Sequence, residues 1–232
     1  MSRLVVITGA SSGIGRELAL LCGANGDELI LTARRRIELE RTAADSGAAK
    51  VGVVCGDITD SSVWGQIAED ARGSAAELIL VNNAGLASFG GFAEESFSTW
   101  ERQIQVNLVG PFGLTHALIP LMLERGRGRV VNILSIVLKH PLPGAAGYAA
   151  SKAGLEAMNR CLAAEHRRQG ISFTNIYPGA TDTPIWDSAS GHPSRDQMIP
   201  VASVAQTIFE VLNTPRDRVL DEVVITPPDG IL

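Results

Sequence analysis

Short runs of aliphatic and β-branched residues alternate along this chain with longer stretches of helical character, and this alternation is what most limits the fold. The expected strands cover residues 3–8, 28–33, 51–55, 77–82, 129–134, 172–177 and 222–226. Helices are expected over residues 14–24, 97–125, 148–169 and 201–213. A further helix is expected to end near residue 45, and another to begin near residue 60. Strands that are apolar throughout, with helices between them, are typical of a parallel sheet buried on both faces. The sequence therefore predicts a three-layer, doubly wound α/β fold.

Composition agrees with one globular domain over residues 1–232. Of the 232 residues, 45% are hydrophobic and 19% are charged, and no linker rich in Pro, Gly or Ser divides the chain. The net charge of −5 argues against nucleic acid or an anionic membrane as a partner. The cysteines at 22, 55 and 161 lie far apart, so we expect neither a disulfide framework nor a metal site.

Two further segments bear on location and on ligand access. The amino-terminal apolar run is too short for a signal sequence. The sequence contains no run of about 18 apolar residues that would indicate a transmembrane helix. We therefore expect a cytoplasmic protein. Residues 182–200 are the least regular stretch, with Pro, Gly, Ser and Asp clustered after the sixth expected strand, and they are a candidate substrate lid.

A glycine-rich turn joins the first expected strand to the first expected helix. It reads Thr-Gly-Ala-Ser-Ser-Gly-Ile-Gly over residues 8–15. Glycines between a strand and a helix let the backbone approach a pyrophosphate and aim the helix N-terminus at it. The candidate cofactor-binding residues here are Gly9, Ser11, Ser12, Gly13, Ile14 and Gly15.

The end of the second expected strand indicates which dinucleotide is preferred. An NAD site usually carries Asp or Glu at this place for the ribose 2′-hydroxyl, whereas this chain has Arg34, Arg35 and Arg36. A guanidinium suits a 2′-phosphate because its planar fork forms paired, charge-assisted hydrogen bonds. We therefore expect NADP(H) to be preferred, with Arg34 and Arg35 as its ligands, and use of NAD(H) stays open.

A tyrosine and a lysine are spaced to share one face of a helix. Tyr148 and Lys152 are four residues apart near the start of the expected helix 148–169, and Ser135 follows the fifth expected strand. An ammonium close to a phenol favours the phenolate and lowers the phenol pKa from about 10. Tyr148 would then serve as a general acid for carbonyl reduction or as a general base for alcohol oxidation.

With these motifs in order, the chain resembles the short-chain dehydrogenase/reductase family, in its compact branch. The resemblance covers nearly the whole sequence. It rests on TGASSGIG at residues 8–15, NNAG at 82–85, Asn107 within QVNLVG, Ser135, YAASK at 148–152 and PGATDT at 178–183. It implies a Rossmann-type fold with a seven-stranded parallel sheet in the order 3-2-1-4-5-6-7 and helices on both faces.

The resemblance also implies roles for individual residues. Ser135 would bind the substrate oxygen and Tyr148 would transfer the proton. Lys152 would lower the pKa of the tyrosine and hold the nicotinamide ribose, while Asn107 would distort its helix and bind a water that links Lys152 to solvent. Further cofactor contacts would come from Asp57, Ile58, Asn82, Asn83, Ala84, Gly85, Pro178, Gly179, Thr181 and Thr183.

The activity predicted from these residues is NADPH-dependent reduction of a ketone or aldehyde, or the reverse oxidation of a secondary alcohol. Two alternatives stay open: a non-catalytic NADP-binding regulatory or scaffold protein, and a 3-oxoacyl-type reductase served by an acyl-carrier protein. Candidate substrate contacts are Ser135, His140 and Trp186. The family resemblance further implies a homodimer or homotetramer.

Overall fold

The computed structural model describes residues 2–187 and 194–230, and within them the chain forms one seven-stranded parallel sheet in the order β3-β2-β1-β4-β5-β6-β7. The predicted strand order is therefore confirmed. The strands are β1 (Arg3–Thr8), β2 (Glu28–Ala33), β3 (Val51–Cys55), β4 (Glu77–Asn82), β5 (Gly128–Ile133), β6 (Ile171–Pro178) and β7 (Glu222–Ile225). The predicted strand bounds agree with these to within about a residue at either end.

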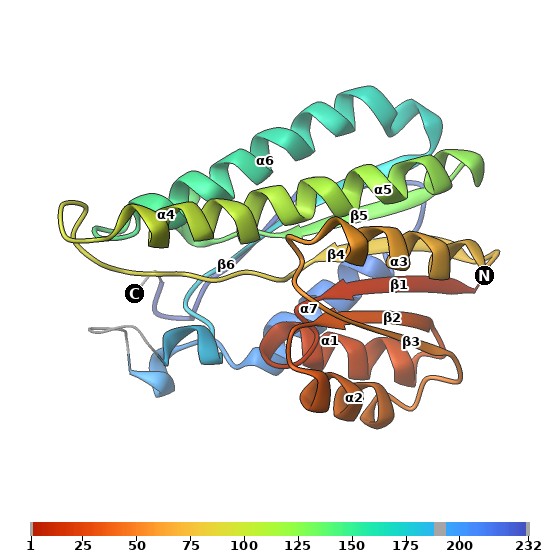
Figure 1. Ribbon diagram of the computed structural model, residues 1–232, viewed down its shortest axis with the longest axis horizontal. Coiled ribbons are helices and arrows are strands. Elements are labelled where there is room, and N and C mark those ends of the chain that lie inside the picture. Colours follow the sequence, from red (N-terminus) through yellow and green to blue (C-terminus); the bar gives the residue numbers. More distant parts are fainter. Residues whose placement is uncertain (1, 188–193, 231–232) are drawn as a thin grey trace.

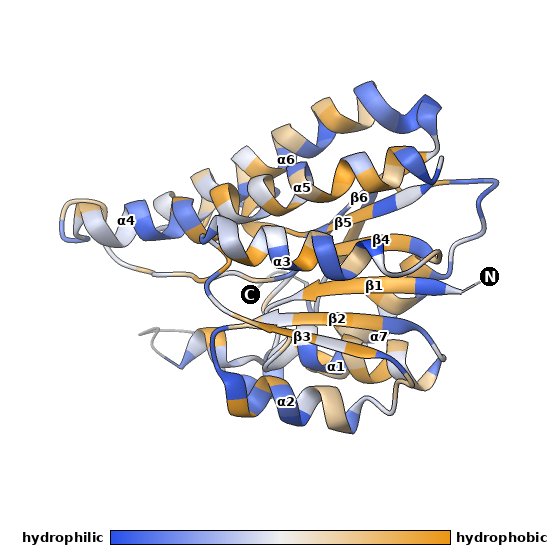
Figure 2. Ribbon diagram, turned by 45° about the vertical axis from the view of Figure 1, so that its right-hand side comes forward, coloured by the Kyte–Doolittle hydropathy of each residue, from blue (hydrophilic) through white to orange (hydrophobic). Residues whose placement is uncertain are grey.

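Helices cover both faces of the sheet (Figure 1). They are α1 (Gly13–Ala24), α2 (Arg36–Asp45), α3 (Ser61–Arg72), α4 (Phe97–Ile104), α5 (Gly110–Glu124), α6 (Ala146–His166) and α7 (Val201–Leu212). Successive residues of a strand point to opposite faces, so β1 feeds two cores. Leu4 and Val6 pack with α3 and α5, whereas Val5 and Ile7 pack with α1, α2 and α7. Figure 2 shows the strands as mainly hydrophobic and the outer α2 as mainly hydrophilic.

The long helix predicted over residues 97–125 is interrupted, but not at Pro111 or Gly113, although these residue types often kink a helix. A π-helical segment, Gln105–Val109, separates α4 from α5, and it ends just before Pro111. Gly113 serves another purpose, because a Cβ there would lie 2.3 Å from the Trp64 ring of α3. The small residue therefore permits close packing of two helices, and the irregularity lies at the segment that carries Asn107.

The same helical run, Phe97–Glu124, is the one candidate membrane span by length and composition within the described part of the chain. Of its most apolar window, 61% is buried inside the protein. Its apolar side chains pack on the sheet, since Leu114, Leu118 and Met122 belong to the core beside α3. The run is therefore mostly buried in the core of the protein.

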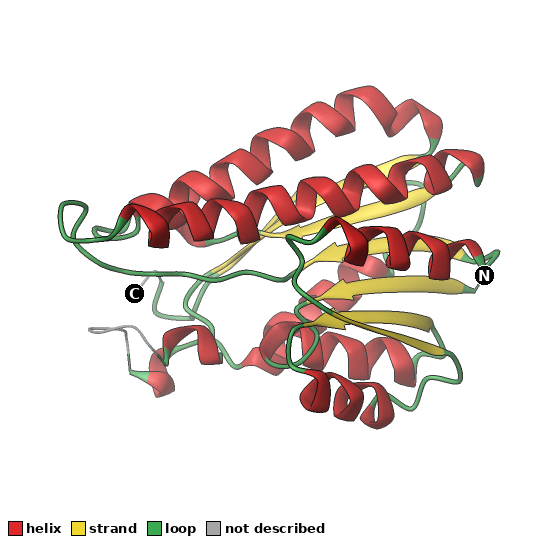
Figure 3. Cartoon of the chain, in the orientation of Figure 1, coloured by secondary structure: helices red, strands yellow, loops and turns green. Residues whose placement is uncertain are grey.

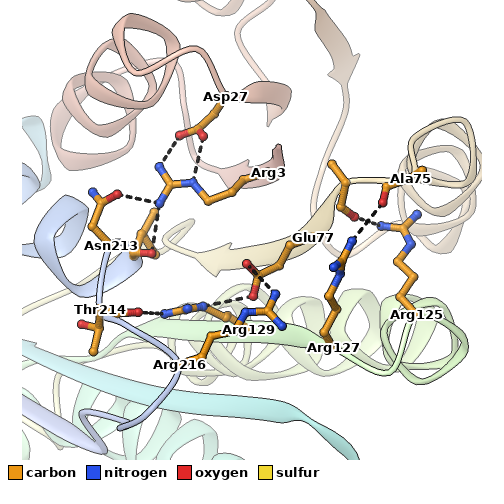
Figure 4. Close-up of polar contacts among 12 residues, drawn as sticks. Arg3, Asp27, Ala75, Glu77, Arg125, Arg127, Arg129, Asn213, Thr214 and Arg216 are labelled. Carbon is orange, nitrogen blue, oxygen red and sulfur yellow. Dashed lines mark hydrogen bonds and ion pairs between the residues drawn. The ribbon is translucent and has the colours of Figure 1, made fainter. Parts of the chain in front are cut away.

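Ion pairs hold the amino ends of the strands together (Figure 4). Arg3, the first residue of β1, donates to Asp27 with an Nε–Oδ1 distance of 2.8 Å, and the two side chains are only 10% and 4% exposed. Glu77, the first residue of β4, accepts from Arg129 at 3.2 Å and from Arg216 at 3.0 Å. These contacts fix the edge of the sheet that lies opposite the ligand-binding edge.

Candidate active site

A cavity of about 1050 Å³ opens at the carboxyl edge of the sheet. The loops that follow the strands gather at this edge (Figure 3). Open α/β sheets bind ligands at this edge. The cavity is lined by the glycine turn, by the ends of β2 and β3, by the segments after β4, β5 and β6, and by the start of α6. Residues far apart in the sequence therefore meet around one hollow that is large enough for a dinucleotide and a small substrate.

The glycine turn is shaped as the sequence predicts. Gly9 has φ +68°, and a Cβ there would lie 2.9 Å from Cα of Ala84, so the turn and the segment after β4 are in close contact. The Thr8 hydroxyl strengthens this contact by accepting hydrogen bonds from the backbone N–H groups of Asn83 and Ala84, at 3.0 and 2.8 Å. Thr8 was not among the predicted site residues, although its position just before the first glycine could have suggested it.

The N-terminus of α1 faces this cavity without a side-chain cap. Ser12 occupies the N-cap position and makes no capping hydrogen bond, and Ser12, Gly13 and Ile14 line the cavity. The first N–H groups of a helix have no partner within the helix, and the helix dipole makes this end favourable for an anion. The turn and helix end together fit the pyrophosphate of a dinucleotide.

Arginines lie at the end of β2, beside the glycine turn. Arg34 and Arg35 both line the cavity, and Arg35 Nη2 donates to the Ser11 hydroxyl at 3.1 Å. Arg36 does not line the cavity and instead pairs with Glu40, one turn along α2. Two exposed guanidiniums at this corner fit a phosphate on the adenosine ribose.

The adenine end of the cavity contains an ion pair that the sequence did not predict. Asp57, which follows β3, pairs with Arg102 of α4, and both residues line the cavity together with Ile58. Burial acts to raise the pKa of Asp57, but hydrogen bonds from Thr59 and Arg102 outweigh it and hold this pKa below its usual value. Arg102 was not among the predicted cofactor-binding residues. No local pattern reveals its true position, because α4 and the end of β3 meet only in the folded chain.

Ser135 and Tyr148 meet at the other end of the cavity. Ser135 lies two residues after the end of β5, and its hydroxyl accepts from the backbone N–H of Val137 at 3.2 Å. Tyr148 lies in the first turn of α6 and is 9% exposed. Burial raises the pKa of Tyr148 to about 12, although its hydrogen bond with Ser135 acts to lower it. The sequence predicted a lowered pKa for this phenol, and that prediction is wrong because burial dominates.

Lys152 lies one turn after Tyr148 on the same face of α6 and is 3% exposed. Its Nζ donates to the carbonyl oxygen of Ile133 at 2.7 Å and lies 5.8 Å from the centre of the Tyr148 ring. Burial lowers the pKa of Lys152 to about 8. The ammonium is thus close to the tyrosine and lines the cavity, but its hydrogen bond goes to the end of β5.

Asn107 sits in the π-helical segment and is fully buried. Its side-chain amide bonds both backbone groups of Leu86, accepting from N at 2.9 Å and donating to O at 2.8 Å, and it also donates to Ser151 at 3.0 Å. The helix distortion implied by the family resemblance is present. Asn107 lies behind the cavity wall rather than in it, and it fixes the segment after β4 against α6.

Most of the remaining predicted residues reach the cavity, and a few do not. Asn83, Ala84, Gly85, Pro178, Gly179, Thr181, Thr183, His140 and Trp186 line it. Gly15 and Asn82 lie outside it. Asn82 is 1% exposed and its Nδ2 donates to Asn132 at 2.9 Å and to Thr115 at 3.2 Å, so its amide joins β4 to β5 and α5. Protein partners therefore satisfy Nδ2 of this buried amide, whereas its Oδ1 has no hydrogen-bond partner among the described residues.

Part of the candidate lid can be placed. Residues 188–193 of the expected 182–200 segment lie outside the described residues. On either side of them, Arg195 pairs with Asp182 and Asp187 at 2.6 Å each. Trp186 and Gln197 line the cavity, whereas Met198 is buried and does not line it.

Comparison with known proteins identifies the family. The model of the short chain dehydrogenase family matches residues 3–193. A glycine betaine reductase from Emericella nidulans is 33% identical over 98% of this chain, and the chain spans only 19% of that relative's length. The chain belongs to the short-chain dehydrogenase/reductase family, and it is an NAD(P)-dependent oxidoreductase of the class that interconverts CH–OH and C=O groups.

Solved structures of the family agree with this conclusion. An alcohol dehydrogenase from Thermococcus sibiricus, complexed with 5-hydroxy-NADP, has a TM-score of 0.88 and 26% identity, over 98% of this chain and 97% of that one. A short-chain dehydrogenase from Sphingobium yanoikuyae, in complex with NADPH, has a TM-score of 0.84 and 32% identity, over 97% and 88%. A small-molecule substrate and a nucleotide cofactor are typical of these proteins.

Proposed function

We propose that this protein is an NADPH-dependent carbonyl reductase, which reduces a ketone or aldehyde to the alcohol and can run in reverse. The observation that carries the proposal is the meeting of Ser135, Tyr148 and Lys152 in one cavity that continues into the glycine turn. The full set of catalytic residues also argues against the alternative of a regulatory protein without turnover.

The proposed mechanism assigns one task to each of these side chains. When bound, the reduced nicotinamide supplies the hydride that adds to the carbonyl carbon. Ser135 donates a hydrogen bond to the carbonyl oxygen and polarises it. Tyr148 Oη gives its proton to that oxygen, and the nearby Lys152 ammonium stabilises the phenolate that remains. Asn107 keeps the wall behind Lys152 in place.

A preference for NADP(H) is supported by the two arginines after β2. Arg34 and Arg35 line the cavity beside Ser11, and no carboxylate occupies the position that would bind a ribose 2′-hydroxyl. The neighbours solved with NADPH and with 5-hydroxy-NADP agree with this preference. Use of NAD(H) as a second cofactor is compatible with the same site.

We further propose a single cytoplasmic domain with a substrate lid near residues 182–200, assembled as a homodimer or homotetramer. Assembly through α4 and α5 is supported by Phe97 and Phe112, whose rings are 73% and 55% exposed. Exposed aromatic residues on neighbouring helices are common in interfaces between subunits.

The test of the chemical step is Tyr148→Phe, with Tyr177→Phe as the matched control. Tyr177 has the chain's other phenol, which donates to Glu156 at 3.0 Å and does not line the cavity. We expect Tyr148→Phe to lower kcat about 10²- to 10⁴-fold across a panel of carbonyl compounds, with NADPH binding retained. Near-normal turnover in Tyr148→Phe would refute the role, and tight NADPH binding without turnover in the wild type would favour the regulatory alternative.

Cofactor choice is tested by titrating NADPH and NADH under identical salt, following cofactor fluorescence. Replacing either Arg34 or Arg35 alone with Gln should weaken NADPH binding about 10- to 100-fold, because one charge-assisted contact to phosphate contributes about 1.5–3 kcal/mol. NADH binding should change little. Arg36→Gln is the control, since Arg36 pairs with Glu40 outside the cavity. Equal losses for both cofactors, or none, would contradict the assignment.

A further inference from the structure

Two aromatic side chains form a wall next to Tyr148 at the substrate end of the cavity. Phe89 comes from the segment after β4, and Trp186 comes from a short helical turn after β6. Their rings are parallel, with an interplanar angle of 4° and centroids 5.1 Å apart. Phe89 also meets the Tyr148 ring edge-on, with centroids 6.1 Å apart and an angle of 61°. The wall therefore adjoins the ring of the tyrosine that is proposed to protonate the substrate.

The orientation of the indole is fixed by polar contacts outside the wall. Trp186 Nε1 donates to the carbonyl oxygen of Thr181 at 3.1 Å. Arg195 bridges Asp182 and Asp187, which flank the turn that carries Trp186. An aromatic surface that is held before a ligand arrives loses little conformational entropy on binding. The wall is thus a preorganised stacking surface.

The surroundings of the wall are neutral. Apart from the three catalytic side chains, the described residues that line this end are mainly apolar, including Val137, Leu142 and Ile185, and the larger polar side chains are His140 and Gln197. The nearest carboxylates, Asp182 and Asp187, are paired with Arg195 and do not line the cavity. Arg34, Arg35, Asp57 and Arg102 belong to the adenosine end. Among the described residues, and apart from Lys152, no charged side chain therefore lines the cavity beside the wall.

We propose that Phe89 and Trp186 form a binding subsite for an aromatic ring, so that the substrate class is an uncharged aryl ketone or aryl aldehyde and the corresponding alcohol. This inference rests on the proposed carbonyl reductase activity. Aromatic rings attract one another in stacked and edge-on arrangements beyond the effect of buried area alone, and the wall offers both geometries next to Tyr148. An aliphatic ring of similar size would bury similar area without this additional attraction.

The experiment compares phenyl methyl ketone with cyclohexyl methyl ketone, with NADPH as the reductant. We expect the wild type to favour the phenyl compound in kcat/KM. In Trp186→Leu and in Phe89→Leu, the phenyl-to-cyclohexyl ratio should fall about two- to tenfold, the size of one aromatic pair contribution. Trp186→Phe keeps an aromatic face and should retain most of the ratio. A ratio that does not change in either Leu variant would overturn the subsite.

Binding without turnover provides a second measurement. In the complex with NADPH, 1-phenylethanol cannot be oxidised, so its dissociation constant can be compared with that of 1-cyclohexylethanol. The phenyl compound should bind more tightly to the wild type, and this advantage should shrink in the Leu variants. NADPH affinity in each variant reports whether the cavity is still folded. Equal affinity for the two alcohols in the wild type would overturn the subsite.

The outcomes separate the subsite from the activity on which it rests. Turnover of aliphatic carbonyls but not of the phenyl ketone would overturn the subsite and leave the reductase proposal standing. Faster turnover of (trimethylammonio)acetaldehyde than of the phenyl ketone would also overturn it, because aromatic faces attract cations as well and the wall would then recognise charge. Failure of the wild type to bind either NADPH or NADH would overturn the proposed activity itself.

Discussion

Replacing Lys152 with Met should stabilise the folded protein while removing its activity. The ammonium of Lys152 is buried, and burial lowers its pKa from 10.5 to about 8. A charged amine is therefore held in the fold at neutral pH at a cost in stability. Methionine has a similar length without the charge, so the substitution removes this cost with little change in packing.

The size of the effect follows from the pKa shift. A difference of about 2.5 pH units corresponds to about 3 kcal/mol at 1.36 kcal/mol per unit. The substitution also removes the hydrogen bond from Nζ to the Ile133 carbonyl, which costs about 1 to 2 kcal/mol. We therefore expect Lys152→Met to be about 1 to 2 kcal/mol more stable than the wild type at pH 7. Active sites often carry destabilising groups that function requires.

The pH dependence of the free energy of unfolding distinguishes the two proteins more clearly than their difference at pH 7. The folded pKa lies below the unfolded one, so between about pH 8 and 10.5 the unfolded chain binds more protons and the wild type gains stability as pH rises. Below about pH 8 the cost is present in full. The variant lacks this gain. Tyr148 and Cys22, whose pKa values burial raises to about 12, act in the opposite direction but are present in both proteins.

The assay is urea unfolding of both proteins at pH 7, 8, 9 and 10, analysed as the difference in free energy of unfolding. The advantage of Lys152→Met should shrink by about 1 kcal/mol per pH unit above pH 8. Parallel pH profiles for the two proteins would refute the reasoning, since they would show that the amine is not buried as a charged group. Loss of carbonyl turnover in the variant is expected from the proposed role of Lys152.

Two further substitutions test other parts of the fold. Asp27→Asn should lower the free energy of unfolding by about 3 kcal/mol in denaturant titrations, because it leaves the Arg3 guanidinium buried without its counter-charge; a loss below about 0.5 kcal/mol would show that the pair contributes no more than an exposed one. Gly15→Ala should weaken NADPH binding and lower the melting temperature, because the new Cβ would lie 2.6 Å from the Gly9 carbonyl oxygen. Unchanged cofactor affinity in Gly15→Ala would mean that the turn adjusts without cost.

The features that the sequence predicted correctly depend on residues close together in the chain. Those that it did not predict depend on contacts between distant segments. The strand pattern, the glycine turn and the spacing of Tyr148 and Lys152 are local, so the sequence was sufficient to predict them. The pKa of Tyr148 was predicted in the wrong direction, because burial depends on everything that surrounds the ring. Asn82 belongs to a motif associated with the cofactor, yet its side-chain amide donates hydrogen bonds to Asn132 and Thr115 in the core.

By itself, the sequence determined a doubly wound parallel sheet and a dinucleotide site at its carboxyl edge, because hydrophobic periodicity and glycine placement act over a few residues. Only the tertiary structure decided that Arg102 reaches Asp57, and that Phe89 lies parallel to Trp186. Each of these contacts joins segments that follow different strands. The order of the strands in the sheet sets which of these segments meet, and packing of the helices sets how their side chains face one another.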